Sequence, residues 1–260
     1  MKLEVEGFSG GDRIQLGLPR VQEELLEKVV AIGKPTVLVL LNGSALAVNW
    51  AKDNAPAIVE LWYPGQAGGT ALADVLFGDY NPAGRLPVTF YQSENQIPPF
   101  TDYGMRGKTY RFFTGEPLYP FGYGLSYTKF SYRNLQMPGE ISTGLGLKAS
   151  VEVENTGGRA GEEVVQLYLS HAGAPAGAPI RSLEGFERVR LAPGEKKVVE
   201  FNLMPRQLST AGDGGTRTVS PGIVEISIGG KQPGFHGAAD AASTEVLTGS
   251  VKITGEARFW

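Results

Sequence analysis

The hydrophobic pattern of this chain changes its period once, and that change constrains the fold more than any other feature. After about Ser126, apolar and polar residues alternate in short runs such as LKASVEVEN, EEVVQLYLS, KKVVEFNL and GIVEISIGG. A period of two turns one face of a strand toward a core and the other toward water. Turn sequences such as NTGG, APGE and SPG separate the runs. Residues 126–260 are therefore predicted to form an all-β sandwich domain.

The first 125 residues follow a helical period that short apolar runs interrupt. Apolar residues recur at helical spacing between Pro19 and Gly33, which suit the first position and the residue after the end of a helix. The run TVLVLL, residues 36–41, is typical of a strand buried in a parallel sheet. This alternation predicts part of an α/β sandwich, a three-layer arrangement around a mostly parallel sheet.

Three further elements are predicted in this half. ALAVNWAKDNAPAIVELWY has helical character interrupted by Pro56, TALADVLFG is a second short helix, and LPVTF is a strand. Too few strands are available for a complete doubly wound sheet. The predicted fold class is thus α/β plus all-β, with residues 1–125 as the partial α/β sandwich and residues 126–260 as the β-sandwich.

The absence of cysteine from the chain narrows both fold and chemistry. Disulfides, thiolate catalysis and cysteine-based metal sites are excluded. The strand pattern fits a sandwich of immunoglobulin or fibronectin-III type, and the missing cysteine pair favours the fibronectin-III type. His171 and His236 are the only histidines and lie far apart in the sequence, so no metal site is expected.

Charge and hydropathy exclude several classes of partner. The net charge of −3 and pI of about 5.6 provide no basic field for nucleic acid or anionic lipid. No apolar run approaches the roughly 20 residues needed to span a bilayer. No signal peptide is visible after Met1, which predicts a cytoplasmic location for the chain as it stands, while a longer parent could be periplasmic or secreted.

Several separated phrases, in this order, carry a family resemblance. They are GFSGGDRIQLGLP, NGSALAV, ELWYPGQAGGTALADVLFGDYNPAGRLPVTFY, PLYPFGYGLSYTKF and SLEGFERVRLAPGE. Together they resemble the end of the second catalytic domain of glycoside hydrolase family 3 and its passage into a fibronectin-III-like domain. The wording TDYGMRGKTYRFFTGEPLYPFGYGL is most similar to the β-xylosidase-type members.

The resemblance implies a parent enzyme that hydrolyses a terminal non-reducing β-linked sugar with retention and without metal or organic cofactor. Such chemistry needs two carboxyl groups. In the family the nucleophilic aspartate comes from a (β/α)8 barrel, which is expected to be absent from this chain. By the family's register the acid/base glutamate lies a residue or two upstream of Met1, which leaves Glu4 and Glu6 as fallback candidates. The chain alone is expected to be inactive.

The resemblance also implies the partners. They are a β-linked oligosaccharide or aryl glycoside, together with the missing barrel domain or a separate barrel chain. An apolar patch on residues 1–125 that the barrel would cover also favours self-association into a homo-oligomer.

Two groups of residues are candidates for the site. Tyr103, Arg106, Tyr110 and Arg111, with Lys108 between them, combine aromatic faces with hydrogen-bond donors and are expected to contact the sugar. The alternative is a surface loop that packs its aromatic rings on the sandwich or on the barrel. Asp12 and Arg13 are expected to support the acid/base loop, with direct sugar contact as the alternative.

Other features are interpreted as structural. The GQAGG loop lacks the lysine of a phosphate-binding loop, and Ser44 does not lie in a nucleophile elbow. Trp50, Trp62 and Tyr63 are expected to pack in the core or between domains. Glu162 and Glu163 are interpreted as ordinary strand-edge charges. The competing hypothesis for the whole chain is a non-catalytic module that binds carbohydrate or a protein.

Overall fold

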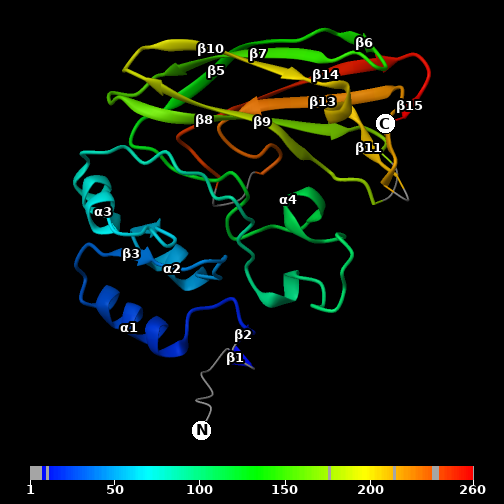
Figure 1. Ribbon diagram of the computed structural model, residues 1–260. Helices are drawn as coiled ribbons and strands as arrows, with labels where there is room; N and C mark the ends of the chain where they lie inside the picture. Colours follow the sequence, from blue (N-terminus) through cyan, green and yellow to red (C-terminus); the bar gives the residue numbers. More distant parts are fainter. Residues whose placement is uncertain (1–7, 10–11, 175–176, 213–214, 236–239, 260) are drawn as a thin grey trace. The chain divides into compact units, whose positions relative to one another are not determined.

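The computed structural model describes residues 8–9, 12–174, 177–212, 215–235 and 240–259 (Figure 1). The chain divides into two compact units. The α/β unit comprises Met1–Tyr80, Val88–Lys108 and Thr114–Pro120, and the sandwich unit comprises Asn81–Pro87, Thr109–Phe113 and Phe121–Trp260. The units thus interleave along the sequence, while a domain boundary after residue 125 stays a prediction.

The helices of the α/β unit lie only partly where the sequence predicts them. They are α1 (Arg20–Ala31), α2 (Asn49–Asn54), α3 (Gly68–Phe77) and the 3-10 helix η1 (Glu94–Gln96). Pro19 directly precedes α1, and Gly33 lies just beyond its end with φ of 75°. Gly78 ends α3 with φ of 84°. Both glycines occupy the left-handed conformation that ends helices at low cost, as predicted.

A parallel pair of strands forms the sheet of this unit. β3 (Val37–Leu40) pairs with β4 (Ala57–Glu60), and a small hairpin, β1 (Phe8–Ser9) with β2 (Asp12–Arg13), precedes α1. The prediction of a strand in a parallel sheet is confirmed by β3, but its expected burial is not, because Leu40 alone of its four residues is buried.

Two element predictions in this unit are wrong. The segment around Pro56 is not one interrupted helix, because Ala55 before the proline is extended, as proline requires of its predecessor, and Ala57–Glu60 continue as a strand. LPVTF forms no strand; only Phe90 makes an isolated bridge, with Tyr119. No helix in the described part of the chain is long and apolar enough to cross a membrane.

The sandwich unit consists of two main sheets, which Figure 1 shows one above the other. The three-stranded sheet has the order β10 (Lys196–Leu203), β7 (Leu147–Asn155), β5 (Phe130–Gln136). The five-stranded sheet has the order β6 (Glu140–Ser142), β14 (Val246–Thr254), β13 (Gly222–Gly229), β8 (Gly161–His171), β9 (Ser182–Leu191). All pairs are antiparallel except β6 with β14.

Smaller elements complete the sandwich unit. β11 (Thr210–Ala211), β12 (Arg217–Val219) and β15 (Arg258–Phe259) form a minor sheet. The short helices are α4 (Thr109–Phe112) and the 3-10 helix η2 (Pro205–Leu208).

The core lies between the two main sheets and consists of the alternate apolar residues of their strands. Val151 and Val153 of β7 meet Leu167 of β8 and Ile226 and Ile228 of β13 in one buried cluster. All five are fully buried. The period of two therefore identified the inward side chains correctly.

Strands β5 and β9 were not predicted, because apolar and polar residues do not alternate regularly along either of them. β5 shifts register between Arg133 and Gln136, where Asn134 has φ of 55°. β9 contains an extra residue, Glu184, where Leu167 of β8 is opposite Gly185 and Tyr168 is opposite Leu183. A bulge inserts a residue and moves the following side chains to the other face, which hides the period.

Two isoleucines of β13 test whether the core supplies the stability of the sandwich unit. Ile226 is fully buried, whereas Ile223 is 43% exposed. Ile226→Ala is expected to lower the free energy of unfolding by about 2–5 kcal/mol, because a cavity replaces packed methyl groups. Ile223→Ala should cost no more than about 1 kcal/mol. Denaturant unfolding of the full chain gives both values, and equal losses would contradict this assignment of the core.

Candidate functional site

The segment predicted to contact sugar begins with a loop of the α/β unit. Hydrogen-bonded turns fix the conformation of this loop. The Asp102 amide donates to the Pro99 carbonyl at 2.9 Å, and the Gly104 amide donates to Asp102 Oδ1 at 2.7 Å. The loop displays Tyr103, which is 89% exposed, and the exposed Arg106. A ring and a guanidinium on a pre-ordered loop suit a sugar, and their contact with it stays a prediction.

Tyr110 and Arg111 belong to the other unit, in α4. The Tyr110 ring stacks on Phe121 with a centroid distance of 4.0 Å and meets the edge of Tyr168 at 6.1 Å. Its hydroxyl accepts a hydrogen bond from the Leu183 amide at 3.1 Å. The Arg111 carbonyl accepts from the Ile180 amide at 2.8 Å. Tyr110 thus has the packing role that was the alternative interpretation, and a sugar contact for either residue stays a prediction.

Asp12 and Arg13 lie in β2, at the start of the α/β unit. Nη2 of Arg13 donates to Ser44 Oγ at 2.9 Å and to the Ala45 carbonyl at 2.8 Å. Arg13 therefore joins the β1–β2 hairpin to the loop after β3. This geometry is compatible with a supporting role, which remains a prediction. The fallback carboxylates Glu4 and Glu6 lie outside the described residues.

Arg13 also borders a cavity of about 670 Å³ in the α/β unit. The cavity wall is built from α1, β3 and the loops around them, including Asn42, Ser44 and Tyr63. None of the residues that line it is an aspartate or a glutamate. A retaining glycosidase needs a pair of carboxyl groups at its reaction centre, so this cavity is not such a centre by itself.

Glu60 is a carboxylate that the sequence analysis did not single out. It ends β4, beside the end of β3, where ligands of parallel sheets commonly bind. Its Oε1 accepts from the Trp62 amide at 3.1 Å, and Trp62 has φ of 54°, a strained value for a large side chain. Burial raises the pKa of Glu60, although the hydrogen bonds from the Trp62 amide and the Asn42 side chain oppose the rise. Tyr63 next to it is 77% exposed, which contradicts its expected packing role within this unit.

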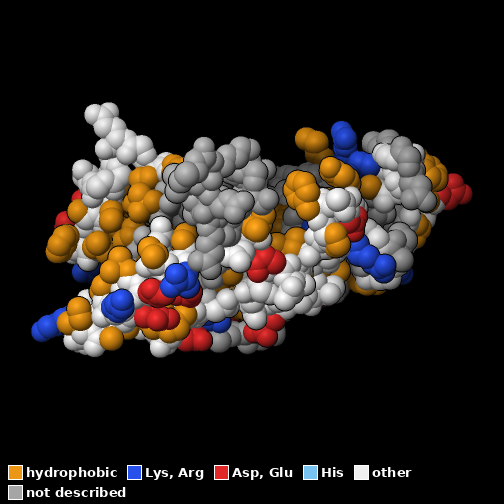
Figure 2. Space-filling model, turned by 90° about the horizontal axis from the view of Figure 1, so that it is seen from below, with side chains coloured by type: hydrophobic (Ala, Val, Ile, Leu, Met, Phe, Trp, Pro, Cys, Tyr) orange, Lys and Arg blue, Asp and Glu red, His pale blue; other side chains and the backbone are white. Residues whose placement is uncertain are grey.

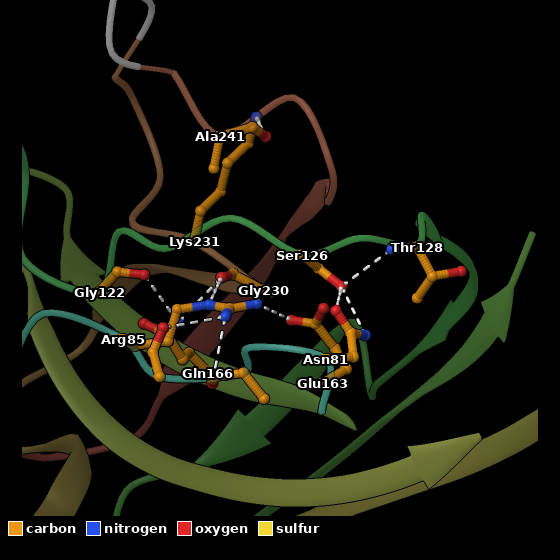
Figure 3. A network of polar contacts seen from close by, with 12 residues as sticks. Asn81, Arg85, Gly122, Ser126, Thr128, Glu163, Gln166, Gly230, Lys231 and Ala241 are labelled. Atoms are coloured by element: carbon orange, nitrogen blue, oxygen red, sulfur yellow. Dashed lines mark hydrogen bonds and ion pairs between the residues drawn. The ribbon is translucent and has the colours of Figure 1, made fainter. Parts of the chain in front are cut away.

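The sandwich unit contains a buried ion pair between Arg85 and Glu163 (Figure 3). Nη2 of Arg85 donates to Glu163 Oε1 at 2.8 Å, and the two side chains are 6% and 0% exposed. Nε of Arg85 donates to the Gly230 carbonyl at 2.9 Å. The donors of the guanidinium are therefore bonded to fixed protein acceptors, and the role of Arg85 is structural.

Further hydrogen bonds extend this network. Nε2 of Gln166 donates to the same Gly230 carbonyl at 3.0 Å, and the Tyr168 hydroxyl donates to Gln166 Oε1 at 2.5 Å. Asn81 begins the segment that carries Arg85, and its Oδ1 accepts a hydrogen bond from the Tyr127 amide at 2.7 Å. Figure 3 shows Gln166 and Gly230 beside Arg85, and Asn81 hydrogen-bonded to Ser126.

The interpretation of Glu163 as an ordinary strand-edge charge is wrong, whereas the neighbouring Glu162 fits it. Glu162 forms a partly exposed ion pair with Arg188. Burial raises the pKa of Glu163, and the Arg85 guanidinium works against that rise. The pair therefore keeps a charge in the interior that would otherwise be too costly.

No metal site accompanies these residues in the described ranges, where no cluster of three or more histidine, cysteine or acidic side chains occurs. His171 ends β8, and burial lowers its pKa. His236 lies outside the described residues.

Comparisons with known proteins identify the family. Residues 2–127 match the Glycosyl hydrolase family 3 C-terminal domain, and residues 163–232 match the Fibronectin type III-like domain. A xylan 1,4-beta-xylosidase from Xylanibacter ruminicola is 43% identical over 230 residues, which are 88% of this chain and 26% of that protein. A periplasmic beta-glucosidase from Salmonella typhimurium is 44% identical over 202 residues, 73% of this chain and 26% of that protein.

A solved structure supports the same family assignment. A β-glucosidase from Erythrobacter marinus superposes with a TM-score of 0.80 at 38% identity, over 96% of this chain and 32% of that one. The chain belongs to glycoside hydrolase family 3, of which it carries the C-terminal α/β region and the fibronectin-III-like domain. It spans about a quarter to a third of the length of these relatives.

The buried pair gives a pH-dependent test. Arg85→Met is expected to lower the free energy of unfolding by about 3–5 kcal/mol at pH 7, because Glu163 is left buried without a counter-charge. The folded-state pKa of Glu163 is already raised and rises further in this variant. The deficit should therefore shrink as the pH falls toward the ordinary glutamate value of about 4.5, where Glu163 is protonated.

Arg188→Met is the matched control, since it breaks the more exposed pair with Glu162 on the same strand. Its cost should be no more than about 1 kcal/mol. Urea unfolding at several pH values separates the two variants. A deficit of Arg85→Met that is small, or that grows on acidification, would contradict the role assigned to the pair.

Proposed function

We propose that this chain forms the C-terminal wall and brace of a retaining β-glycosidase that acts on terminal non-reducing β-xylosides or β-glucosides. The observation that carries the proposal is the match to family 3 over both of its units. Relatives at 43% and 44% identity are named as a xylosidase and a glucosidase. The α/β unit would supply one wall of the active site, and the sandwich unit would hold that wall in place.

In this proposal the reacting carboxyl groups come from elsewhere. The cavity beside Arg13 has no carboxylate in its lining, and Glu163 is buried and paired with Arg85. A barrel domain or a separate barrel chain would supply the nucleophile. The 260-residue chain alone would then hydrolyse no glycoside, because most of the rate enhancement depends on the carboxyl pair.

The test compares the chain with a chimera. In the chimera this chain replaces the aligned C-terminal-domain and fibronectin-III-like portion of the Xylanibacter ruminicola xylosidase. With p-nitrophenyl β-xyloside and β-glucoside, the chimera is expected to turn over at least one substrate and the isolated chain neither. Hydrolysis by the isolated chain that follows its purification, or a folded chimera with no activity, would contradict the proposal.

Tyr103 gives a test of sugar contact within the same chimera. Tyr103→Ala is expected to raise KM by about 2- to 10-fold, the worth of one aromatic contact, with kcat little changed. Phe77→Ala is the control, because Phe77 is similarly exposed at 84% but lies at the end of α3. An unchanged KM in Tyr103→Ala, or equal effects of the two variants, would remove Tyr103 from the substrate site.

The exposed aromatic loop also favours a second candidate function, a non-catalytic carbohydrate-binding module. Phe100 and Tyr103 are 95% and 89% exposed on the same loop. Retention of the isolated chain on xylan, together with an inactive chimera, would favour this second function.

A further inference from the structure

Trp62 has a backbone conformation that a large side chain seldom adopts. It lies just after the end of β4, and its φ is 54°. Such a conformation is strained and persists only where the surrounding contacts hold it. Strained residues of this kind gather at ligand sites and active sites. The turn at Trp62 is therefore a candidate for a functional role.

Contacts on the backbone and on the ring of Trp62 hold this turn. Glu60 Oε1 accepts a hydrogen bond from the Trp62 amide at 3.1 Å. Nδ2 of Asn42 donates to Glu60 Oε2 at 3.4 Å, which links the carboxylate to the loop after β3. The Trp62 ring meets the Phe90 ring edge to face, with 6.1 Å between the centroids. Because Trp62 is fixed in this way, the direction of the next residue is fixed as well.

The residue that this turn presents is Tyr63, which is 77% exposed. Exposed apolar side chains are common, as Figure 2 shows for one face of this chain, so exposure alone does not mark a site. The Tyr63 ring, however, lies against Gly43, where a Cβ atom would be 2.8 Å from Cε2 of the ring. Glycine therefore leaves the room that the ring needs. Tyr63 is thus exposed and also held in position, as a binding residue must be.

Tyr63 lies where parallel sheets commonly bind their ligands. β3 and β4 run in parallel, and Asn42 and Tyr63 follow their carboxyl ends. Here the cavity of the α/β unit is polar, since Arg13, Asn42 and Ser44 border it together with Tyr63. An aromatic ring beside a few polar groups is the usual composition of a small-molecule site.

We propose that Tyr63 contacts the sugar of the substrate and that Glu60 is the residue that positions it; the inference rests on the proposed function. The apolar face of a sugar ring would pack on the exposed side of the Tyr63 ring, with its hydroxyl groups toward the polar end of the cavity. Arg13 is the one charged residue that borders this cavity, and its guanidinium is already bonded to Ser44 and Ala45. The site therefore fits a neutral sugar.

The first measurement uses the chimera with the Xylanibacter ruminicola xylosidase. Tyr63→Ala is expected to raise KM for the p-nitrophenyl glycoside about 2- to 10-fold with kcat little changed, because one aromatic contact made equally in the ground and transition states is lost. Phe77→Ala is the matched control, since it removes a ring that is 84% exposed at the end of α3. This control should leave KM unchanged.

The positioning role of Glu60 has its own test in the same chimera. Glu60→Ala removes the acceptor of the Trp62 amide and should raise KM by a similar factor, whereas Glu60→Gln keeps a side-chain oxygen and should restore KM. Gly43→Ala should also raise KM, because the added methyl group displaces the Tyr63 ring. Neither Glu60→Ala nor Gly43→Ala should add to the effect of Tyr63→Ala, since no ring is then left to position. Circular dichroism should show that the variants fold.

Binding is also measured without hydrolysis. Xylobiose and cellobiose are titrated into the isolated 260-residue chain while the ring signals of Tyr63, assigned by their loss in Tyr63→Ala, are followed by NMR. A saturable shift of these signals is expected with at least one of the two sugars. The same titration of Phe77→Ala should give the same shift.

Several outcomes overturn the inference. They are an unchanged KM in Tyr63→Ala, an equal effect of Phe77→Ala, and a KM effect of Glu60→Ala that persists in the Tyr63→Ala background. A lower unfolding temperature of the Tyr63→Ala chimera with an unchanged KM would show that Tyr63 packs against the rest of the enzyme instead. Saturable shifts of Tyr63 together with a folded but inactive chimera would support the sugar contact and contradict the proposed function. An active chimera whose KM does not depend on Tyr63 would do the reverse.

Discussion

The buried ion pair between Arg85 and Glu163 is the interaction on which the arrangement of the sandwich unit depends. It makes a segment from the middle of the α/β sequence, Asn81–Pro87, part of the sandwich unit. Charges are this deeply buried only where hydrogen bonds and a partner offset the loss of water. Arg85 meets this condition with Glu163 and with the Gly230 carbonyl. The pair fixes where the chain enters the sandwich more than it adds net stability.

A second contact, made by Tyr110, attaches a later part of the same sequence region to the sandwich unit. Tyr110 of α4 packs against Phe121 and Tyr168, so Thr109–Phe113 also belongs to the sandwich unit. The intervening segments return to the α/β unit, and one of them carries the exposed Tyr103. The chain therefore passes several times between the two units from Asn81 to Phe121.

Some of these features could be predicted from the sequence and others could not. Alternation identified the inward side of β8, and Glu163 shares the parity of Val165 and Leu167, so the same pattern already placed this carboxylate in the core. Its partner was not predictable, because Arg85 lies 78 residues away and no local pattern joins the two. Glu60 was missed for another reason: its segment was taken for helix, so its place at a strand end went unseen.

The central claim, that Asn81–Pro87 folds as part of the sandwich through Arg85 and Glu163, is tested most directly by native-state hydrogen exchange. The relevant amides are Leu86, which donates to the Tyr123 carbonyl, and Gly122, which donates to the Leu86 carbonyl. They are predicted to exchange with the same opening free energy and denaturant dependence as the central amides of β8, and to lose more protection in Arg85→Met than the central amides of β8 lose. Exchange of Leu86 and Gly122 at a lower free energy than the central amides of β8, unchanged in Arg85→Met, would contradict the account.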